Sequence, residues 1–331
     1  MKTKIIILFL LGIFSFLPSE AQQIVVHDPV MVQADGTYYL FCTGMGISSF
    51  SSADMKNWKK EKPVFAKAPE WAVNTVPGFK GHIWAPDIIY FNGKYNLFYS
   101  VSAFGKNTSC IGLVTTPTLK QDDPAFKWTD HGKIIQSVPG RDDWNAIDPN
   151  LIVDENNQPW LAFGSFWSGI KLVKLRSDLT AIAEPQEWYG LAKRPKSFSI
   201  SDTLAGDGAI EAPFIFRHKK YYYLFVSFDY CCRGVNSNYK IMVGRSEKVT
   251  GPYLDKDGKA MAEGGGSLVL QGDENYHGLG HSATYTFNGK DYIIYHAYDS
   301  KDAGKPKLII SELAWSTDDW PQVVRQEESG K

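Results

Sequence analysis

Five similar units follow one another along this chain, and they constrain its fold more than any other feature. Each unit has a polar residue before a short apolar strand, then a turn and a second strand rich in aromatic and aliphatic residues. The units recur roughly every 60 to 70 residues. Their polar residues are Asp28, Asp87, Asp148, Glu211 and His281. Strand-rich repeats of this length predict equivalent modules of one fold.

Turn residues divide the units into hairpins. Four of the turns contain the pairs Asp35-Gly36, Asn92-Gly93, Asn156-Asn157 and Asn288-Gly289. Asn-Gly and Asp-Gly pairs are strong hairpin signals because both residues tolerate a positive φ. A third strand is expected after each hairpin, at 46–52, 109–116, 169–175, 239–246 and 306–314.

Five all-β units with almost no helical periodicity predict a five-bladed β-propeller over residues 22–331. In a propeller the innermost strand of each blade lines a central channel. The five polar residues are therefore expected to gather at one end of that channel.

The first 21 residues have the features of a secretory signal peptide. Lys2 and Lys4 precede an apolar run at 5–17, and cleavage is expected after Ala21. The apolar run is shorter than the roughly 20 residues that a membrane-spanning helix needs. We therefore expect export to the periplasm or the outside of the cell, without a membrane anchor.

Composition excludes some partners. The formal net charge of −1 and the lack of a basic stripe argue against nucleic acid or an anionic membrane as partner. Aromatic residues make up 14% of the chain, which suits either a sugar-binding surface or a β-rich core. We expect a monomer.

The four cysteines do not have the spacing of a zinc site. Cys42 and Cys110 lie in apolar strands and are expected to be small buried hydrophobes. Cys231 and Cys232 are adjacent, and a bond between neighbours is strained and rare. The sequence leaves their disulfide state open.

Carboxylates that converge on one cleft repel each other, and such clusters push pKa values apart. Glycoside hydrolysis needs one protonated and one ionised carboxyl group, and a third can tune the acid. Calcium binding is the rival chemistry, but the acids come from different blades and a dense Asp/Asn loop is lacking. The alternative interpretation is that these acids have no catalytic or binding role and are simply solvated at the starts of their strands.

Four motifs resemble those of family 43 glycoside hydrolases: HDP at 27–29, HIWAPD at 82–87, NAIDPN at 145–150 and IEAPF at 210–214. The segments GSFWSGI at 164–170 and FDYCCRGVNSNYKI at 228–241 resemble the endo-1,5-α-L-arabinanase branch. The resemblance implies a five-bladed propeller that cleaves internal α-1,5 linkages of arabinan with inversion. It implies no organic cofactor.

The resemblance also implies roles for individual acids. Asp28 would be the general base that activates water, and Glu211 the general acid. Asp148 would modulate the pKa of the acid and orient it. Asp87 is expected to be structural or to orient the substrate. His281 would lie beside a calcium ion in the channel and help to hold it through water; a core histidine is the alternative.

Other residues of these motifs are candidates for contacts with the sugar. Trp84, Phe166 and Trp167 could stack on sugar rings, and Asn145 and Ser165 could bind hydroxyl groups. Other tryptophans and one histidine are expected to be structural: Trp58, Trp128, Trp315 and His296. The Cys231-Cys232 turn is expected near the cleft, contributing shape rather than thiol chemistry.

Three other functions compete with this interpretation. An exo-acting arabinanase or arabinofuranosidase, or a β-xylosidase, would use the same acids behind a cleft of different shape. A propeller that binds glycans without cleaving them belongs to another class. Three converging acids argue against that function, because a protein that only binds has no use for them.

Overall fold

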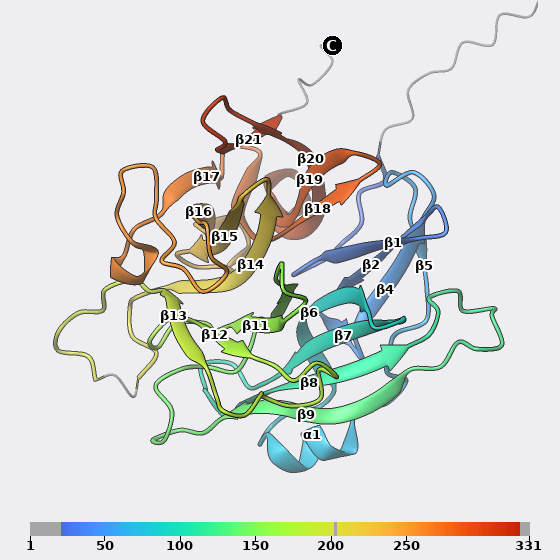
Figure 1. Ribbon diagram of the computed structural model, residues 1–331. Coiled ribbons are helices and arrows are strands. Elements are labelled where there is room, and N and C mark those ends of the chain that lie inside the picture. Colours follow the sequence, from blue (N-terminus) through green and yellow to red (C-terminus); the bar gives the residue numbers. More distant parts are fainter. Residues whose placement is uncertain (1–20, 202–203, 325–331) are drawn as a thin grey trace, which may run out of the picture.

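The computed structural model describes residues 21–201 and 204–324. Five antiparallel sheets are arranged around a common centre (Figure 1). The predicted five-bladed β-propeller is therefore confirmed. The predicted signal peptide lies, apart from Ala21, outside the described residues and stays a prediction. Within the described ranges, no helix is both long enough and apolar enough to cross a membrane.

Four blades have four strands each, and the second has a fifth. The first blade contains β1 (Val30–Ala34), β2 (Thr37–Cys42), β4 (Ser48–Ser52) and β5 (Lys59–Lys60). The second contains β3 (Gly44–Met45), β6 (His82–Phe91), β7 (Lys94–Val101), β8 (Ser109–Thr116) and β9 (Thr129–Ser137). The third contains β10 (Asn150–Val153), β11 (Pro159–Phe163), β12 (Ile170–Lys174) and β13 (Trp188–Ala192).

The remaining strands form the last two blades. The fourth contains β14 (Ile210–His218), β15 (Tyr221–Phe228), β16 (Lys240–Ser246) and β17 (Ser267–Gln271). The fifth contains β18 (Tyr276–Phe287), β19 (Lys290–Asp299), β20 (Lys305–Trp315) and β21 (Pro321–Val324). The helical segments are short: α1 (Glu70–Thr75) and the 3-10 helices η1 (Gly234–Asn236), η2 (Met261–Glu263) and η3 (Ser300–Asp302).

The predicted turns connect the two inner strands of their blades. Asn92 and Gly93 have φ values of 52° and 75°, and the flanking Phe91 and Lys94 pair across β6 and β7. Both turn residues therefore have the left-handed conformation of a two-residue hairpin. The fourth blade also has a two-residue turn between His218 and Tyr221, but there only Lys219 has a positive φ, of 52°. The sequence carries no turn signal at this position.

Both ends of the described chain join the fifth blade. Val25 pairs with Lys307 of β20, and the Leu308 N–H donates to the Ile24 carbonyl at 3.2 Å. The other end of β20 pairs with β21, near the C-terminus. The ring is thus closed by hydrogen bonds between the first and last segments of the chain.

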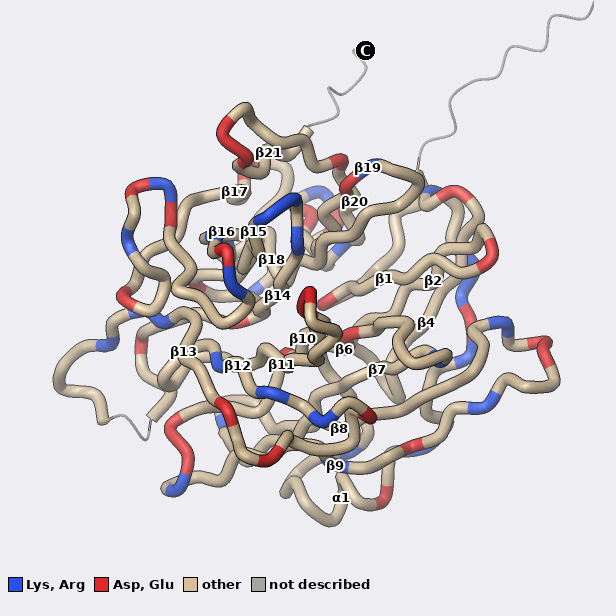
Figure 2. Tube along the Cα trace, viewed as in Figure 1, with Lys and Arg blue, Asp and Glu red and all other residues tan. Residues whose placement is uncertain are grey.

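Apolar side chains fill the spaces between neighbouring blades. Phe98 of the second blade and Leu161 of the third belong to one fully buried cluster. Met31 of the first blade and Ile294 of the fifth belong to another, beside the closure. Lys and Arg are interspersed with Asp and Glu along the outer loops (Figure 2). Burial between blades therefore holds the ring together and fixes where the inner strands begin.

A residue with positive φ lies at the start of the inner segment of every blade, two residues before β1 and β10 and within the first half of β6, β14 and β18. These residues are Asp28 (54°), Ala85 (42°), Asp148 (59°), Ala212 (56°) and His281 (50°). In the second, fourth and fifth blades the strand pairing shifts register at this point, as in a β-bulge. We call this position the blade entry.

The blade entries correct the sequence alignment of the repeats. Asp87 lies two residues beyond the entry of its blade, Ala85, and Glu211 lies one residue before its entry, Ala212. The predicted equivalence of these two acids with Asp28 and Asp148 is therefore wrong. The reason is that the entry is marked by the proline that follows it in four blades, Pro29, Pro86, Pro149 and Pro213, and not by the position of the acid.

In four blades the backbone N–H of the entry residue donates a hydrogen bond to a side chain of the preceding blade. The donor–acceptor pairs are Ala85 to Thr43 Oγ1 (2.8 Å), Asp148 to Ser100 Oγ (2.9 Å), His281 to Ser227 Oγ (2.9 Å) and Asp28 to His296 Nδ1 (3.2 Å). The fourth blade differs, because Gly164 occupies the corresponding position and has no side chain. The Ala212 N–H donates instead to Asp148 Oδ2 at 3.1 Å. The third blade thus supplies a carboxylate where the others supply a hydroxyl or imidazole group.

Candidate active site

A cleft of about 790 Å³ lies where the blade entries meet. Asp28, Asp148, Glu211 and His281 all line it. The five predicted sugar-contact residues line it too: Trp84, Asn145, Ser165, Phe166 and Trp167. The fold therefore brings together residues from all five blades, as the repeat predicts.

Asp28 is a buried carboxylate surrounded by hydrogen-bond donors. Its Oδ2 accepts from Thr43 Oγ1 at 2.5 Å, and its Oδ1 lies 2.7 Å from His27 Nδ1 and 3.1 Å from His281 Nδ1. Burial raises the pKa of Asp28, but the charges and hydrogen bonds of His27 and His281 outweigh it and hold that pKa well below its usual range. Asp28 is therefore ionised at neutral pH.

Asp148 has the opposite electrostatic environment. Burial raises its pKa to about 8, and the charges of Glu211 and Asp28 act in the same direction, against His281 and the Ala212 N–H. Asp148 therefore keeps a proton under conditions in which Asp28 has lost its own. Two acids in one cleft with opposite shifts are the arrangement that acid–base chemistry requires.

Glu211 is held by hydroxyl groups on both carboxyl oxygens. Ser165 Oγ donates to Oε2 at 2.6 Å, and Tyr239 Oη donates to Oε1 at 2.6 Å. Since Asp148 accepts the N–H of Ala212, the next residue in the chain, it also holds the backbone that carries Glu211. Ser165 was predicted to contact the sugar, and in this structure it orients an acid.

His281 lies among the three acids and binds Asp28. Burial lowers its pKa, but the charges of Asp28, Asp148 and Glu211, together with the hydrogen bond to Asp28, raise it to about 9. The imidazolium ring therefore offsets part of the negative charge in the cleft. The other buried histidine, His296, packs against the His27 ring with centroids 3.9 Å apart.

Asp87 does not line the cleft. It is buried in the inner strand, where its Oδ2 accepts from the Leu151 N–H at 2.7 Å and lies 3.3 Å from Asn150 Nδ2. Burial raises its pKa to about 7. Both contacts are to the third blade, so Asp87 joins two blades, in agreement with the expected structural role.

The remaining sugar-contact candidates differ in how freely they face the cleft. Phe166 and Trp167 form a tight turn with φ values of 53° and 40°, and Trp167 is largely buried. Trp84 donates through Nε1 to His82 Nδ1 at 3.0 Å. Asn145 is buried, and in the described part of the chain its Oδ1 has no hydrogen-bond partner. That oxygen has almost no exposed surface, so a hydroxyl group of a ligand would reach it only after the side chain turns toward the cleft.

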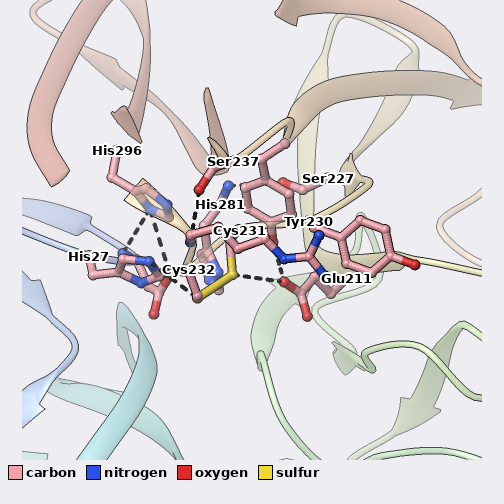
Figure 3. Close-up of a disulfide and its surroundings, with 12 residues drawn as sticks. His27, Glu211, Ser227, Tyr230, Cys231, Cys232, Ser237, His281 and His296 are labelled. Carbon is pink, nitrogen blue, oxygen red and sulfur yellow. Dashed lines mark hydrogen bonds and ion pairs between the residues drawn. A yellow bond between two sulfur atoms is a disulfide. The ribbon is translucent and has the colours of Figure 1, made fainter. Parts of the chain in front are cut away.

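Several cleft residues could not be assigned from the sequence. Thr43 donates to Asp28, Tyr239 donates to Glu211, and Tyr298 contacts His27, the neighbour of Asp28. The sequence context of all three resembles that of ordinary core residues. Cys231 and Cys232 form a disulfide at the cleft wall (Figure 3), a state that the sequence left open. Cys42 and Cys110 are buried free thiols, as expected.

A comparison with family models identifies the chain. The model described as "Glycosyl hydrolases family 43" matches residues 22–321. The chain belongs to glycosyl hydrolases family 43. The predicted family is thus confirmed, and so is the prediction that the protein is a glycoside hydrolase.

Relatives within family 43 cover nearly the whole chain. An extracellular exo-α-(1→5)-L-arabinofuranosidase of Cellvibrio japonicus is 52% identical, covering 93% of this chain and 88% of the relative. An extracellular endo-α-(1→5)-L-arabinanase of Bacillus subtilis is 44% identical, covering 89% and 87%. The solved structure of a Cellvibrio cellulosa α-L-arabinanase complexed with arabinohexaose matches with a TM-score of 0.90 and 51% identity, covering 92% of this chain and 96% of the other.

The ion expected in this family 43 channel would have few protein ligands. Nδ1 of His281 binds Asp28, an arrangement in which a carboxylate orients a ligating ring. An ion would have to use the other nitrogen and displace the proton that the imidazolium carries there. Calcium prefers six to eight oxygen ligands. Within residues 21–201 and 204–324, His281 belongs to no group of three potential metal-ligating side chains. Water would therefore have to supply most of the ligands.

Proposed function

We propose that this protein hydrolyses the α-1,5-linked L-arabinofuranosyl chain of arabinan with inversion of configuration. The convergence of Asp28, Asp148 and Glu211 in one cleft, each in a different hydrogen-bonding environment, carries the proposal. Relatives that cover most of this chain are arabinan-cleaving enzymes by name, which supports the substrate.

Asp28 would act as the general base. Three side-chain donors surround its carboxylate and keep it ionised, so that it can take a proton from a water molecule placed against the sugar carbon. In an inverting reaction this water attacks from the side opposite to the leaving oxygen.

Glu211 would protonate the departing oxygen, with Asp148 as its partner. Ser165 and Tyr239 fix the direction of the Glu211 carboxyl group. Asp148 holds a proton below about pH 8, because burial and the charges of Glu211 and Asp28 raise its pKa. Asp148 would thus tune the acid and, through Ala212, orient it.

The sugar would be held by the other residues of the cleft wall. Trp84, Phe166 and Trp167 would provide apolar faces for furanose rings, and Asn145 Oδ1 would accept a sugar hydroxyl. A hydrated calcium ion would be held through His281, and the acid–base steps above do not depend on it. Elemental analysis of the purified protein before and after chelation would test this ion.

The mode of cleavage has two candidates. The segments at 164–170 and 228–241 imply the endo mode, in agreement with the Bacillus subtilis relative. The Cellvibrio japonicus relative, which has the higher identity, is exo-acting by name and favours the exo mode. Both relatives are extracellular by name, which supports the predicted export.

Products from linear, debranched arabinan, resolved by chromatography over time, would separate these candidates. An early ladder of mixed oligosaccharides is expected for the endo mode, and a single short product from the start for the exo mode. Anomeric analysis by NMR should show the β-anomer first. If linear arabinan is not cleaved but a β-xyloside is, or if binding occurs without any hydrolysis, the proposed substrate is wrong.

A further inference from the structure

The adjacent cysteines 231 and 232 lie between the two acids assigned to catalysis. Their turn follows β15, and their disulfide forms part of the cleft wall (Figure 3). The turn is held from outside the cleft by Asn238 Oδ1, which accepts the Tyr230 N–H at 3.0 Å, and by Ser237 Oγ, which accepts the Arg233 N–H at 3.0 Å. Its position is therefore well defined on both sides of the disulfide.

On the side of the base, a chain of hydrogen bonds runs from the turn to Asp28. The Cys232 N–H donates to Tyr298 Oη at 2.7 Å, and this hydroxyl lies 2.8 Å from His27 Nε2. His27 Nδ1 lies 2.7 Å from Asp28 Oδ1. Tyr298 thus accepts from the backbone on one side and contacts Nε2 on the other, so it fixes the direction in which the His27 ring presents Nδ1 to Asp28.

On the side of the acid, the contact is direct. Cys231 Sγ lies 3.7 Å from Glu211 Oε1, the oxygen that also accepts from Tyr239. A sulfur in a disulfide has no proton to donate, so it limits the rotation of the carboxyl group without competing for its hydrogen bonds. Cys232 Sγ lies 3.8 Å from His27 Nε2 and is likewise unable to donate.

Resting on the proposed function, we propose that the Cys231–Cys232 disulfide is a positioning element that keeps Asp28 and Glu211 in their mutual geometry. A bond between neighbouring side chains closes a small ring with the backbone, which restricts the direction of the Cys232 N–H. Reduction would free this N–H and create two thiol donors, one beside Glu211 and one beside His27. Both acids would then lose their fixed orientation.

The first test uses Tyr298→Phe, which keeps the ring and removes the hydroxyl between Cys232 and His27. We expect kcat on linear arabinan to fall about 10- to 100-fold, the size of effect that follows from misplacing a catalytic group, with KM within about twofold. The fall should be similar on an aryl arabino-oligosaccharide with a nitrophenolate leaving group, because attack by water needs the base whatever group departs. The matched control is Tyr253→Phe, which removes a buried hydroxyl bonded to the Val249 carbonyl at 2.8 Å, away from the cleft.

The second test is reversible reduction of the wild-type protein by a water-soluble phosphine, with the new thiols counted by mass spectrometry. We expect kcat to fall on both substrates as the pair is reduced and to return after re-oxidation. Cys231→Ala/Cys232→Ala should have a low kcat that does not respond to the phosphine. Circular dichroism and thermal unfolding of each form would show that the propeller is intact.

The proposal is overturned if the reduced, folded enzyme keeps its kcat, or if Tyr298→Phe behaves like Tyr253→Phe. An effect on KM alone would also contradict it, because it would make the disulfide a sugar contact. Failure of the proposed function would look different, because the oxidised wild-type protein would then leave arabinan intact.

Discussion

The backbone N–H of Ala212 donates to the carboxylate of Asp148 at 3.1 Å. This bond joins the entries of the third and fourth blades, and Ala212 directly follows Glu211 in the chain. Asp148 therefore acts on Glu211 both through charge and through the backbone. The two parts of the role implied by the family resemblance, tuning the acid and orienting it, would come from one carboxyl group.

Glu211→Gln should abolish most hydrolysis of arabinan while binding of arabino-oligosaccharide persists. The amide keeps the shape, and one of the hydroxyls of Ser165 and Tyr239 can still donate to its oxygen while the other accepts from its NH2 group. The amide cannot, however, transfer a proton to the departing oxygen. We expect kcat on arabinan to fall by at least about 100-fold, the lower range for loss of general acid catalysis. On the aryl substrate the loss should be much smaller, because nitrophenolate departs without protonation. Equal losses on both substrates would contradict the acid role.

Asp28→Ala should lose activity on both substrates, because the base acts on water whichever group departs. Azide is already an anionic nucleophile and needs no base. In an inverting site it should therefore restore part of the turnover of the aryl substrate and give a β-arabinofuranosyl azide, identified by NMR. An α-azide would indicate retention of configuration and refute the inverting mechanism.

Asp148→Asn should raise the stability of the fold over that of the wild type, and this gain should be larger at pH 7 to 8 than at pH 4. The pKa of this carboxyl is raised to about 8 in the folded state, against an ordinary value of 3.8 for an aspartate. The native state therefore binds more protons than the unfolded state between these values, and stability falls as pH rises through this window. Asn mimics the protonated form and is free of this loss. Thermal melts should show a gain in Tm that is larger at pH 8 than at pH 4 by about 2 °C or more; an equal difference at both values would contradict the raised pKa.

Asn145→Ala tests the unpartnered oxygen in the cleft wall. If Oδ1 accepts a sugar hydroxyl, KM for arabino-oligosaccharides should rise about 5- to 10-fold, corresponding to one lost hydrogen bond. Removing Oδ1 breaks no hydrogen bond among the described residues, so the loss of this oxygen should change Tm little. An unchanged KM with a lowered Tm would show that the side chain is structural.

Gly164→Ala should destabilise the third blade. Gly164 has φ +133°, and a Cβ added there would lie 2.5 Å from the Gly169 carbonyl oxygen. We expect a loss of about 1–3 kcal/mol in unfolding free energy, the cost of a strained backbone position. Chemical denaturation measures it, with Gly93→Ala as a control, because that hairpin glycine also has positive φ but open space around it. Similar losses in both variants would show that φ, and not the contact with Gly169, is responsible.

The inner strands were predictable because each has an apolar run, and in four of the five blades a turn signal follows it. The outermost strands were not, since β5 and β13 are short and largely exposed and lack a period-2 pattern. The acids of the cleft could be named, but their register was not recognised, because the acid stands at the entry in the first and third blades and away from it in the second and fourth. The contacts of Asp28 with His281 and His296 join residues more than 250 positions apart, and only the folded ring brings them together.

Asp28 belongs to the first blade, and two of its three histidine neighbours, His281 and His296, belong to the last. The base is therefore completed at the closure, where Val25 pairs with Lys307. During synthesis Asp28 is made early, but its partners His281 and His296 are made only with the fifth blade. A nascent or truncated chain that lacks the fifth blade would carry all three acids and still have an unfinished base, so hydrolysis would begin only when the whole chain has been made.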